Sequence, residues 1–364
     1  MYTHNELAIY IHWPFCRSKC PYCDFYKKVD KNINQESIIN EYIDLLNYYH
    51  SLTPDRNIKS IFFGGGTPSL IEPWYIEKII NFIATKWHCN SDIEISLEAN
   101  PNSNHKNMFT DLRNAGINRL SLGIQALDEN DLRFLGRTHN LQMARECLNE
   151  IVSVFDNHSA DLIYARPNQK IATWEKELDE ITSYGLKHIS LYQLTIEDGT
   201  VFAKRNIKAL NENEASEMYD YTINYLQNKN YNMYEVSNFA QKNFCSKHNL
   251  TYWQGGDYIG IGESAHGRLF LEGNHYAVEY PKKFEKLSAS ERAEELIIMG
   301  LRLVEGINKN NFYKITDIEF EKFVNSQNYM FLKKENFIAE KDCYVMATPK
   351  GFKVLNKIIE ELCC

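Results

Sequence analysis

Residues 10–25 run Tyr10-Ile-His-Trp-Pro-Phe-Cys16-Arg-Ser-Lys-Cys20-Pro-Tyr-Cys23-Asp-Phe25. This stretch places three cysteines on one short loop directly after a β-rich run. Three thiolates can bind three irons of a four-iron, four-sulfur cluster and leave the fourth iron open to a ligand. The same spacing also suits a zinc site that takes a fourth ligand from elsewhere, or a loop of reduced structural thiols. The loop by itself therefore leaves three interpretations open.

The composition predicts a globular, cytoplasmic chain. Its 364 residues are 44% hydrophobic and 24% charged, which suits a barrel-sized unit with an appendage. The net charge of −8 argues against non-specific nucleic-acid binding. The first residues do not predict a signal peptide, and no run of roughly 18 apolar residues predicts a membrane-spanning helix. Nine cysteines, an odd number, argue against a disulfide framework.

Short β-rich runs alternate with helical patterns over the first 200 residues or so. This alternation predicts an α/β fold with a parallel sheet, and six such units suit either an open partial barrel or a doubly wound sheet. The expected strands are Leu7–His12, Ser60–Phe63, Asp92–Glu98, Arg119–Ile124, Ala160–Tyr164 and His188–Leu194. The expected helices lie near Glu36–His50, Trp74–Trp87, Lys106–Ala115, Leu141–Phe155 and Ile171–Tyr184.

The chemically unusual residues fall at the ends of these strands. In both architectures the carboxyl ends of parallel strands carry the functional loops. Cys16 follows the first strand, and the run Gly64-Gly65-Gly66-Thr67 follows the second. Three glycines allow the backbone to approach a ligand closely with exposed N–H groups, or form a tight turn. The Lys-Ser/Thr pair of a P-loop is missing, so a nucleotide phosphate cradle of that kind is excluded.

Together, the Cys-x3-Cys-x2-Cys loop and the Gly-Gly-Gly-Thr-Pro strand end resemble the radical S-adenosylmethionine (SAM) superfamily. The resemblance is closest to its coproporphyrinogen-dehydrogenase-like branch. It implies a radical SAM partial (β/α)6 barrel, a [4Fe-4S] cluster on Cys16, Cys20 and Cys23, and SAM on the open iron. The residues that stand at the branch's SAM-binding positions are Tyr10, Tyr22, Gly65, Gly66, Thr67, Glu98, Gln125, Arg137 and Asp161.

Two departures indicate which members of the branch are most similar. Porphyrinogen-oxidising members carry a fourth cysteine two places after the third, where this chain has Phe25. They also have a longer arm before the cluster loop. In both respects the chain resembles the haem-chaperone (HemW-like) members of the branch. This resemblance implies haem transfer to a target protein without oxidase activity. The alternative is an oxygen-independent coproporphyrinogen III oxidase, and a zinc or iron–sulfur scaffold without SAM chemistry is a third class.

A further segment, Lys247-His248-Asn-Leu-Thr-Tyr252-Trp253, is similar to the one proposed for haem binding in that group. A histidine can ligate haem iron and flanking aromatic rings can cover the porphyrin. A packing role for His248 is weighed equally against it. The resemblance also suggests a homodimer with loose membrane contact, but it names neither the haem acceptor nor the electron donor.

Three regions are expected along the chain. Residues 1–210 form the radical SAM partial barrel, 211–290 an aromatic-rich, loop-rich extension that closes it, and 291–364 a mainly helical, winged-helix-like module. Expected helices in the second half are Glu212–Asn230 and residues 288–304, and a hairpin followed by a helix ends the chain. One position departs from the branch: Ala165-Arg166 stands where Gly-Leu is usual, which leaves the shape of the loop after the fifth strand open.

Overall fold

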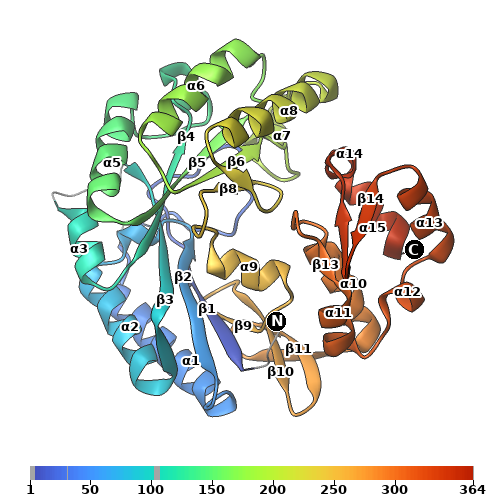
Figure 1. Cartoon of the computed structure of the whole chain (residues 1–364). Helices are drawn as coiled ribbons and strands as arrows, with labels where there is room; N and C mark the ends of the chain where they lie inside the picture. The colour runs from blue at the N-terminus through green and yellow to red at the C-terminus, as the bar shows by residue number, and fades with distance from the viewer. Residues whose placement is uncertain (1–4, 31, 102–106, 364) are drawn as a thin grey trace.

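The computed structural model describes residues 5–30, 32–101 and 107–363, and its largest element is a single curved sheet (Figure 1). Within these residues twelve strands pair in the order β12-β11-β10-β9-β1-β2-β3-β4-β5-β6-β8-β7. β1 to β6 are parallel neighbours in chain order, so the predicted partial barrel is confirmed. They are β1 (Glu6–Trp13), β2 (Asn57–Gly65), β3 (His88–Ala99), β4 (Arg119–Gln125), β5 (Asn157–Tyr164) and β6 (His188–Gln193).

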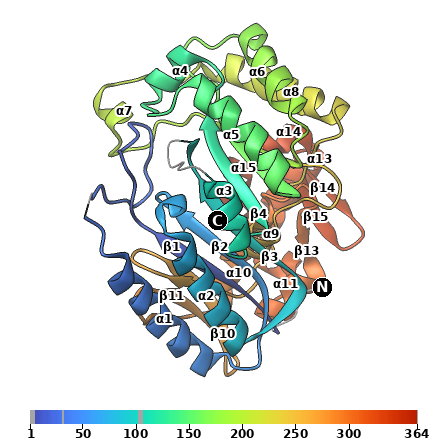
Figure 2. The ribbon, with the colours of Figure 1, turned by 90° about the vertical axis from the view of Figure 1, so that its left-hand side faces the viewer.

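Helices cover the outer surface of these strands, as Figure 2 shows from the side. The predicted helix near Lys106–Ala115 begins at Met108, and Lys106 itself lies outside the described residues. The other helices expected before residue 231 agree with their ranges to within two residues at each end, whereas the helix expected at residues 288–304 ends four residues earlier, at Gly300. The bounds are α1 (Gln35–Leu52), η1 (Pro68–Leu70), α2 (Pro73–Lys86), α3 (Met108–Asn114), α4 (Glu129–Phe134), α5 (Leu141–Val154), α6 (Ile171–Ser183), α7 (Val201–Lys204) and α8 (Glu212–Asn228).

The strands alternate between an apolar outer face and a polar inner face. In β4, Leu120, Leu122 and Ile124 join the main hydrophobic core under the helices. The intervening residues include Arg119 and Ser121, which are also buried. Because side chains of a strand alternate between its two faces, this second set points to the inside of the barrel. The inside therefore holds polar groups, which require partners or a ligand.

The extension at residues 211–290 contains more regular structure than the loop-rich segment that was expected after its first helix. β9 (Tyr258–Ile261) pairs in parallel with β1, and β10 (His266–Leu271), β11 (Asn274–Glu279) and β12 (Lys283–Leu287) continue the sheet beyond it. At the opposite edge, β8 (Asn238–Ala240) and β7 (Asn232–Met233) extend β6. The extension thus lengthens both edges, while the helix α9 (Lys247–Trp253) packs against β2.

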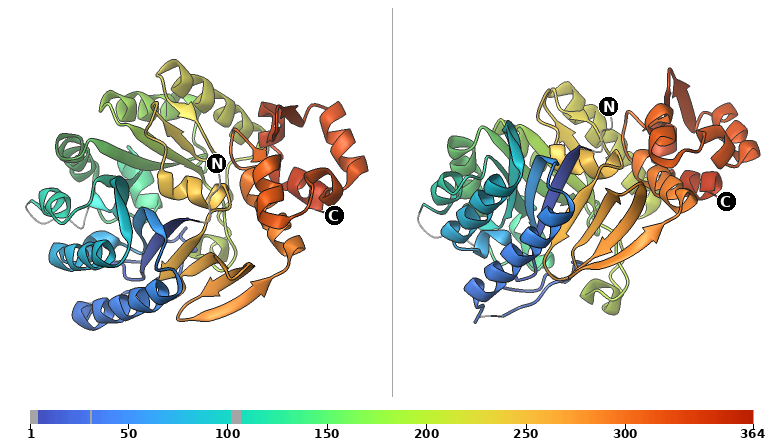
Figure 3. Two further views of the ribbon diagram at one scale, coloured as in Figure 1. Left: turned by 60° about the horizontal axis from the view of Figure 1, so that its bottom comes forward. Right: turned by 90° about the horizontal axis from the view of Figure 1, so that it is seen from below.

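The last part of the chain has a hydrophobic core of its own, built from residues between Ala293 and Leu362. Figure 3 shows this module, in orange to red, on one side of the barrel. A three-stranded antiparallel sheet contains the expected terminal hairpin, β14 and β15. The order is α10 (Ala289–Gly300), β13 (Ile307–Asn308), α11 (Lys309–Thr316), α12 (Phe320–Phe323), α13 (Ser326–Lys334), β14 (Ile338–Lys341), β15 (Tyr344–Ala347), α14 (Pro349–Phe352) and α15 (Leu355–Cys363).

None of the helices in the described parts of the chain is long and apolar enough to cross a membrane.

The loop after β5 explains the departure at Ala165 and Arg166. Ala165 is buried and has a φ of 56°, the left-handed region that favours glycine. The next side chain, Arg166, is almost fully buried, and its guanidinium pairs with Glu177 of α6 and Asp131 of α4. The loop therefore keeps the turn that glycine usually makes, and the arginine ties that turn to two outer helices.

We expect Ala165→Gly to raise the free energy of unfolding by about 0.5 to 1 kcal/mol. The left-handed cost of roughly 1–2 kcal/mol is removed, and the greater freedom of glycine in the unfolded chain offsets part of the gain. Denaturant unfolding measures the difference. Ala160→Gly is the matched control, because Ala160 is equally buried within β5 and its replacement should destabilise the protein. Destabilisation by Ala165→Gly would contradict the explanation.

Candidate functional site

A cavity of about 420 Å³ opens at the carboxyl ends of the parallel strands. The cysteine loop that follows β1 forms one wall, and the ends of β2 to β6 together with the segment after α4 form the remainder. All the residues singled out in the sequence line it except Tyr10 and His248. Those lining it are Cys16, Cys20, Cys23, Tyr22, Gly65, Gly66, Thr67, Glu98, Gln125, Arg137 and Asp161.

The backbone holds the cysteine loop at two points. The Cys16 N–H donates to the Lys28 carbonyl oxygen at 2.9 Å, and the Lys28 N–H donates back to Pro14 at 2.7 Å. Closer to the cavity, the Cys23 N–H donates to the Cys20 carbonyl oxygen at 3.3 Å. The loop is thus closed at its base and turned at its tip, and all three cysteines stay partly accessible.

Two of the sulfur atoms accept hydrogen bonds from other walls of the cavity. The Thr67 hydroxyl lies 3.6 Å from Cys16 Sγ, and Arg137 Nη1 lies 3.6 Å from Cys20 Sγ. Burial raises the pKa of the Cys16 thiol, and the bond from Thr67 opposes that rise. Donors and positive charge beside a thiol favour the thiolate, the form that binds metals.

The glycine run brings the cysteine loop onto the end of β2. Gly65 and Gly66 line the cavity, but their N–H groups bond within the protein: Gly65 to Glu98 Oε2 at 3.2 Å and Gly66 to the Trp13 carbonyl oxygen at 2.7 Å. A Cβ on Gly66 would lie 2.6 Å from the Phe15 carbonyl oxygen. Gly65 has a φ of 108°. The glycines therefore let the cysteine loop lie directly on the end of β2.

Asn100 was not predicted, yet it connects two sides of the site. Its Nδ2 donates to Thr67 Oγ1 at 3.1 Å, and its Oδ1 accepts from Arg137 Nη2. Arg137 Nη2 also donates to the Gly123 carbonyl oxygen at 2.8 Å. Asn100 stands two residues after Glu98 in the same strand-end motif, so its position beside that acid was the available signal. Through it, the donors to Cys16 and Cys20 belong to one network.

Two carboxyl groups face the cavity from the strands on either side of β4. Burial, and secondarily the charge of Asp161, raises the pKa of Glu98 to about 8. Burial also raises the pKa of Asp161, against hydrogen bonds from Ser190 and Ser121; the Ser121 bond is 3.0 Å long. Neighbouring acids inside a protein are held protonated unless a cation compensates their charge. This pair suits a positively charged ligand.

Tyr192 on β6 was also missed, although the sixth strand ends beside the same cavity. Its side chain lines the cavity. Although 43% of Tyr192 is exposed, partial desolvation by the surrounding protein, and then the charges of Asp161 and Glu98, raise the pKa of its hydroxyl above the usual value. The rule that strand ends carry function applies to the sixth strand as to the other five. Tyr192 therefore belongs with the acids as a neutral group of the cavity wall.

Tyr10 lies on the inner face of β1 and does not reach the cavity lining. Its hydroxyl is 3.1 Å from His12 Nδ1, and its ring stacks on Phe62 with centroids 6.2 Å apart. Burial, followed by the nearby charge of Glu98, raises its pKa above the usual value. Its position suits a supporting group behind Glu98.

His248 is enclosed between α9 and the inside of the barrel, with 1% of its surface exposed. Its Nδ1 lies 2.8 Å from Ser60 Oγ, and its Nε2 lies 2.6 Å from the Tyr252 hydroxyl. The ring stacks on Phe62 with centroids 4.9 Å apart. Both ring nitrogens are engaged and no face is open, so the geometry favours the packing role over the haem-ligand role.

We expect His248→Ala to lower the free energy of unfolding by about 2–4 kcal/mol, because it removes a stacked ring and leaves Ser60 and Tyr252 unpartnered. Burial lowers the pKa of His248 to about 3, so the unfolded chain takes up the proton first and this stability is lost as pH falls below about 6.5. Denaturant unfolding at several pH values measures both effects. Exposed His266 provides the matched control, His266→Ala. A stable His248→Ala that fails to bind haem would restore the ligand role.

Comparison with known proteins identifies this arrangement. The model of the radical SAM superfamily matches residues 10–213, and that of the HemN C-terminal domain matches residues 287–354. The chain belongs to the radical SAM superfamily. Its members carry a [4Fe-4S] cluster and SAM, so membership implies both for this chain.

Within the superfamily, near full-length relatives place the chain in the HemN/HemW branch. The heme chaperone HemW of Buchnera aphidicola subsp. Acyrthosiphon pisum is 35% identical, with 99% of each chain covered. The mouse radical S-adenosyl methionine domain-containing protein 1, mitochondrial, is 35% identical over 85% of this chain and 76% of its own. The solved structure of HemN, the coproporphyrinogen III oxidase of Escherichia coli, shares the fold with a TM-score of 0.80 and 19% sequence identity. The match covers 98% of this chain and 89% of the HemN chain.

The residues of the cavity fit the two groups that radical SAM membership implies. In a [4Fe-4S] cluster each cysteine binds a different iron, so the ligands stand farther apart than around one zinc ion. Among the described residues, no three His, Cys, Asp or Glu side chains are placed to hold a single metal ion. Sulfur atoms that accept hydrogen bonds suit cluster thiolates. SAM is a cation at its sulfonium and ammonium, and the buried acids Glu98 and Asp161, whose pKa values are raised, suit such a charge.

Proposed function

We propose that this chain is a haem chaperone: it holds a [4Fe-4S] cluster on Cys16, Cys20 and Cys23, binds SAM in the adjoining cavity, and transfers haem to a target haem protein. The observation that carries the proposal is the near full-length similarity to proteins named heme chaperone HemW, at 32–35% identity. Phe25 supports it, because this position holds a cysteine in the oxidase-type members that the sequence resembles.

The chain's own residues would divide the work at this site. Thr67 and Arg137 would donate hydrogen bonds to two of the cluster-binding sulfurs, with Asn100 fixing both donors. Glu98 and Asp161 would balance the positive charge of SAM, and Glu98, with a pKa of about 8, would release its proton as that charge arrives. When bound, the cluster supplies an electron to SAM. The enclosing strand ends would keep water away from that electron transfer.

We propose a reducing compartment, such as the cytoplasm, as the place of action. Among the described cysteines, six are free thiols: Cys16, Cys20, Cys23, Cys89, Cys245 and Cys343. Cluster thiolates and free cysteines persist where the surroundings are reducing. The haem acceptor and the electron donor would be other proteins of the same compartment.

The proposal is tested with cluster-reconstituted, full-length protein under anaerobic conditions. Ferric haem is titrated while the Soret band is recorded, and a shift that saturates near one haem per chain is expected. The same preparation is then given SAM, a reductant and coproporphyrinogen III. No vinyl product is expected from a chaperone.

Two outcomes contradict the proposal in different ways. A Soret band that does not move at stoichiometric protein would remove haem binding and with it the chaperone. Formation of vinyl groups would show the oxidase activity instead.

A further inference from the structure

Haem needs an accessible surface, and the enclosed ring of His248 does not provide one. Resting on the proposed chaperone function, we propose that haem docks on the outer edge of the cysteine loop. The macrocycle would lie against Phe25, Tyr26 and Val29, here called the aromatic rim. Its two carboxylates would pair with the cations of the same loop.

The aromatic rim is an unusual concentration of exposed apolar side chains. Phe25 is 69% exposed, Tyr26 40% and Val29 53%. Large apolar residues exposed singly need no explanation, but three within five positions form a patch, and such patches mark binding sites. Phe25 also lines the mouth of the cavity that holds the cysteines. The rim therefore continues the candidate site onto the outer surface.

The charge of the loop is opposite to that of the whole protein. Residues 17–28 contain the cations Arg17, Lys19, Lys27 and Lys28 against the single carboxylate Asp24, in a chain of net charge −8. Lys28 is paired with Glu263, and the other three cations of the loop still exceed Asp24, an excess that attracts anions. Arg17 and Lys27 line the cavity mouth beside Phe25, so the positive charge borders the apolar patch.

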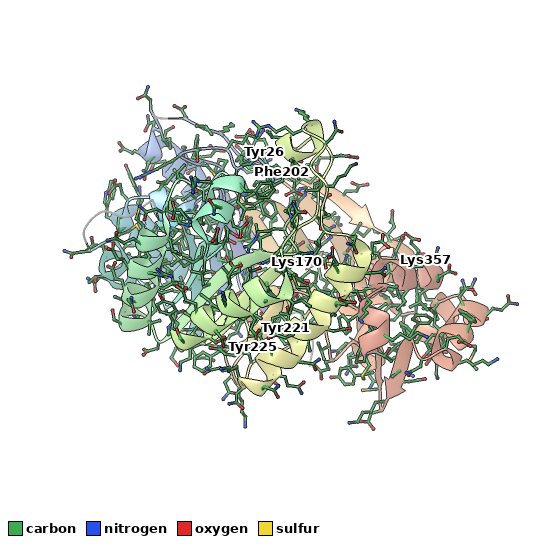
Figure 4. The ribbon with its side chains drawn as sticks, turned by 90° about the horizontal axis from the view of Figure 1, so that it is seen from above. Tyr26, Lys170, Phe202, Tyr221, Tyr225 and Lys357 are labelled. Carbon is green, nitrogen blue, oxygen red and sulfur yellow. The ribbon has the colours of Figure 1, made fainter. Side chains whose placement is uncertain are left out.

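The rim is held in place from beneath. The Tyr26 hydroxyl donates to Glu263 Oε1, and the Lys28 ammonium pairs with Glu263 Oε2, in the loop between β9 and β10. Lys27 Nζ donates to the Cys23 carbonyl oxygen at 2.7 Å and to the Phe25 carbonyl oxygen at 3.1 Å. Figure 4 shows Tyr26 at one edge of the protein, far from Tyr221 and Tyr225 at the opposite edge. A surface fixed before binding loses less entropy when the ligand arrives.

Haem matches this surface in both shape and charge. It is a flat apolar ring that carries two carboxylates on one side, so aromatic side chains can cover one face while cations hold the carboxylates. An acidic electron-carrier protein would also be attracted by the charge. The exposed apolar side chains favour the porphyrin, because charge alone requires no exposed Phe25 or Val29.

The test is a haem titration of cluster-loaded, full-length protein. Phe25→Ser combined with Val29→Ser should weaken haem binding about tenfold or more, since it removes most of the apolar contact. Lys19→Gln should weaken it less, and the loss should fade at high ionic strength. Haem whose two carboxylates are esterified should bind with the same affinity to Lys19→Gln and to the unaltered protein.

The controls separate docking from damage to the loop. Iron content and SAM binding are measured on every variant, and haem affinities are compared on cluster-loaded protein. Val29→Ser alone should keep both properties, because Val29 lies outside the lining of the cavity. Phe331→Ser is the matched surface control, because Phe331 is 58% exposed on α13 of the C-terminal module. It should bind haem as the unaltered protein does.

The possible results distinguish the docking surface from the chaperone function. If the unaltered protein binds no haem, the proposed function fails. If it binds haem and the Phe25→Ser, Val29→Ser variant binds equally well, the function stands and the docking surface is wrong. If that variant binds haem normally but its cluster is reduced slowly by a protein donor and normally by dithionite, the rim serves the electron donor, and the proposal is overturned.

Discussion

Replacing Cys20 by alanine is expected to abolish iron binding after anaerobic reconstitution, from about four irons per chain to nearly none, with loss of the broad absorption near about 400 nm. Cys20 contributes one of the three thiolates of the loop, and Arg137 Nη1 lies 3.6 Å from its sulfur. Two remaining cysteines cannot hold a four-iron cluster. Iron and sulfide analysis with the absorption spectrum measures the effect, and Cys16→Ala and Cys23→Ala should behave alike.

Cys343→Ala is the matched control for this prediction. Cys343 is a free, partly accessible cysteine in the C-terminal module, and its replacement should leave iron content unchanged. The far-ultraviolet circular dichroism of all four variants should match that of the unaltered protein, since the cysteine loop lies outside the helices and the sheet. A preparation that binds zinc and no iron would refute the cluster itself.

The parallel sheet and most of the cavity could be predicted because both follow from local patterns. Alternating strands and helices fix the order of β1 to β6, and parallel strands bring their carboxyl ends to one edge. Cys16, Glu98, Gln125 and Asp161 meet there for that reason. Arg137 could not be placed in this way. It follows α4, not a strand end, and only the resemblance indicated it.

The extension shows what local patterns could not reveal. β9 has four residues and pairs with β1, from which some 250 positions separate it, so only tertiary packing makes it a strand. The sequence of α9 left two roles for His248. The deciding fact is that Ser60, Phe62 and Glu94 of β2 and β3 enclose α9, with Glu94 accepting from the backbone N–H of His248 at 3.1 Å.

Glu98→Gln is expected to make the SAM-free protein more resistant to unfolding at high pH. The pKa of Glu98 is about 8 in the folded protein, above its ordinary value, so the folded chain retains a proton that the unfolded chain has lost. The contribution of protonated Glu98 to the free energy of unfolding is therefore fully present below about pH 4.5. It falls as pH rises toward 8, by at most about 1.4 kcal/mol per pH unit. Contact with cavity water makes the slope shallower. Glutamine does not titrate, so the stability of the two proteins diverges across this window.

Urea unfolding at pH 5, 7 and 9 measures the divergence. Glu197→Gln is the control, because Glu197 is an exposed residue in the lining of the same cavity. That control should show the same pH dependence of unfolding as the unaltered protein.

The proton on Glu98 also allows a second measurement. If SAM places its positive charge beside Glu98, binding near pH 7 must expel the proton, so calorimetric heats should differ between buffers of different ionisation enthalpy. Glu98→Gln should reduce that difference. An equal buffer dependence in the variant would mean that Glu98 does not face the bound cation.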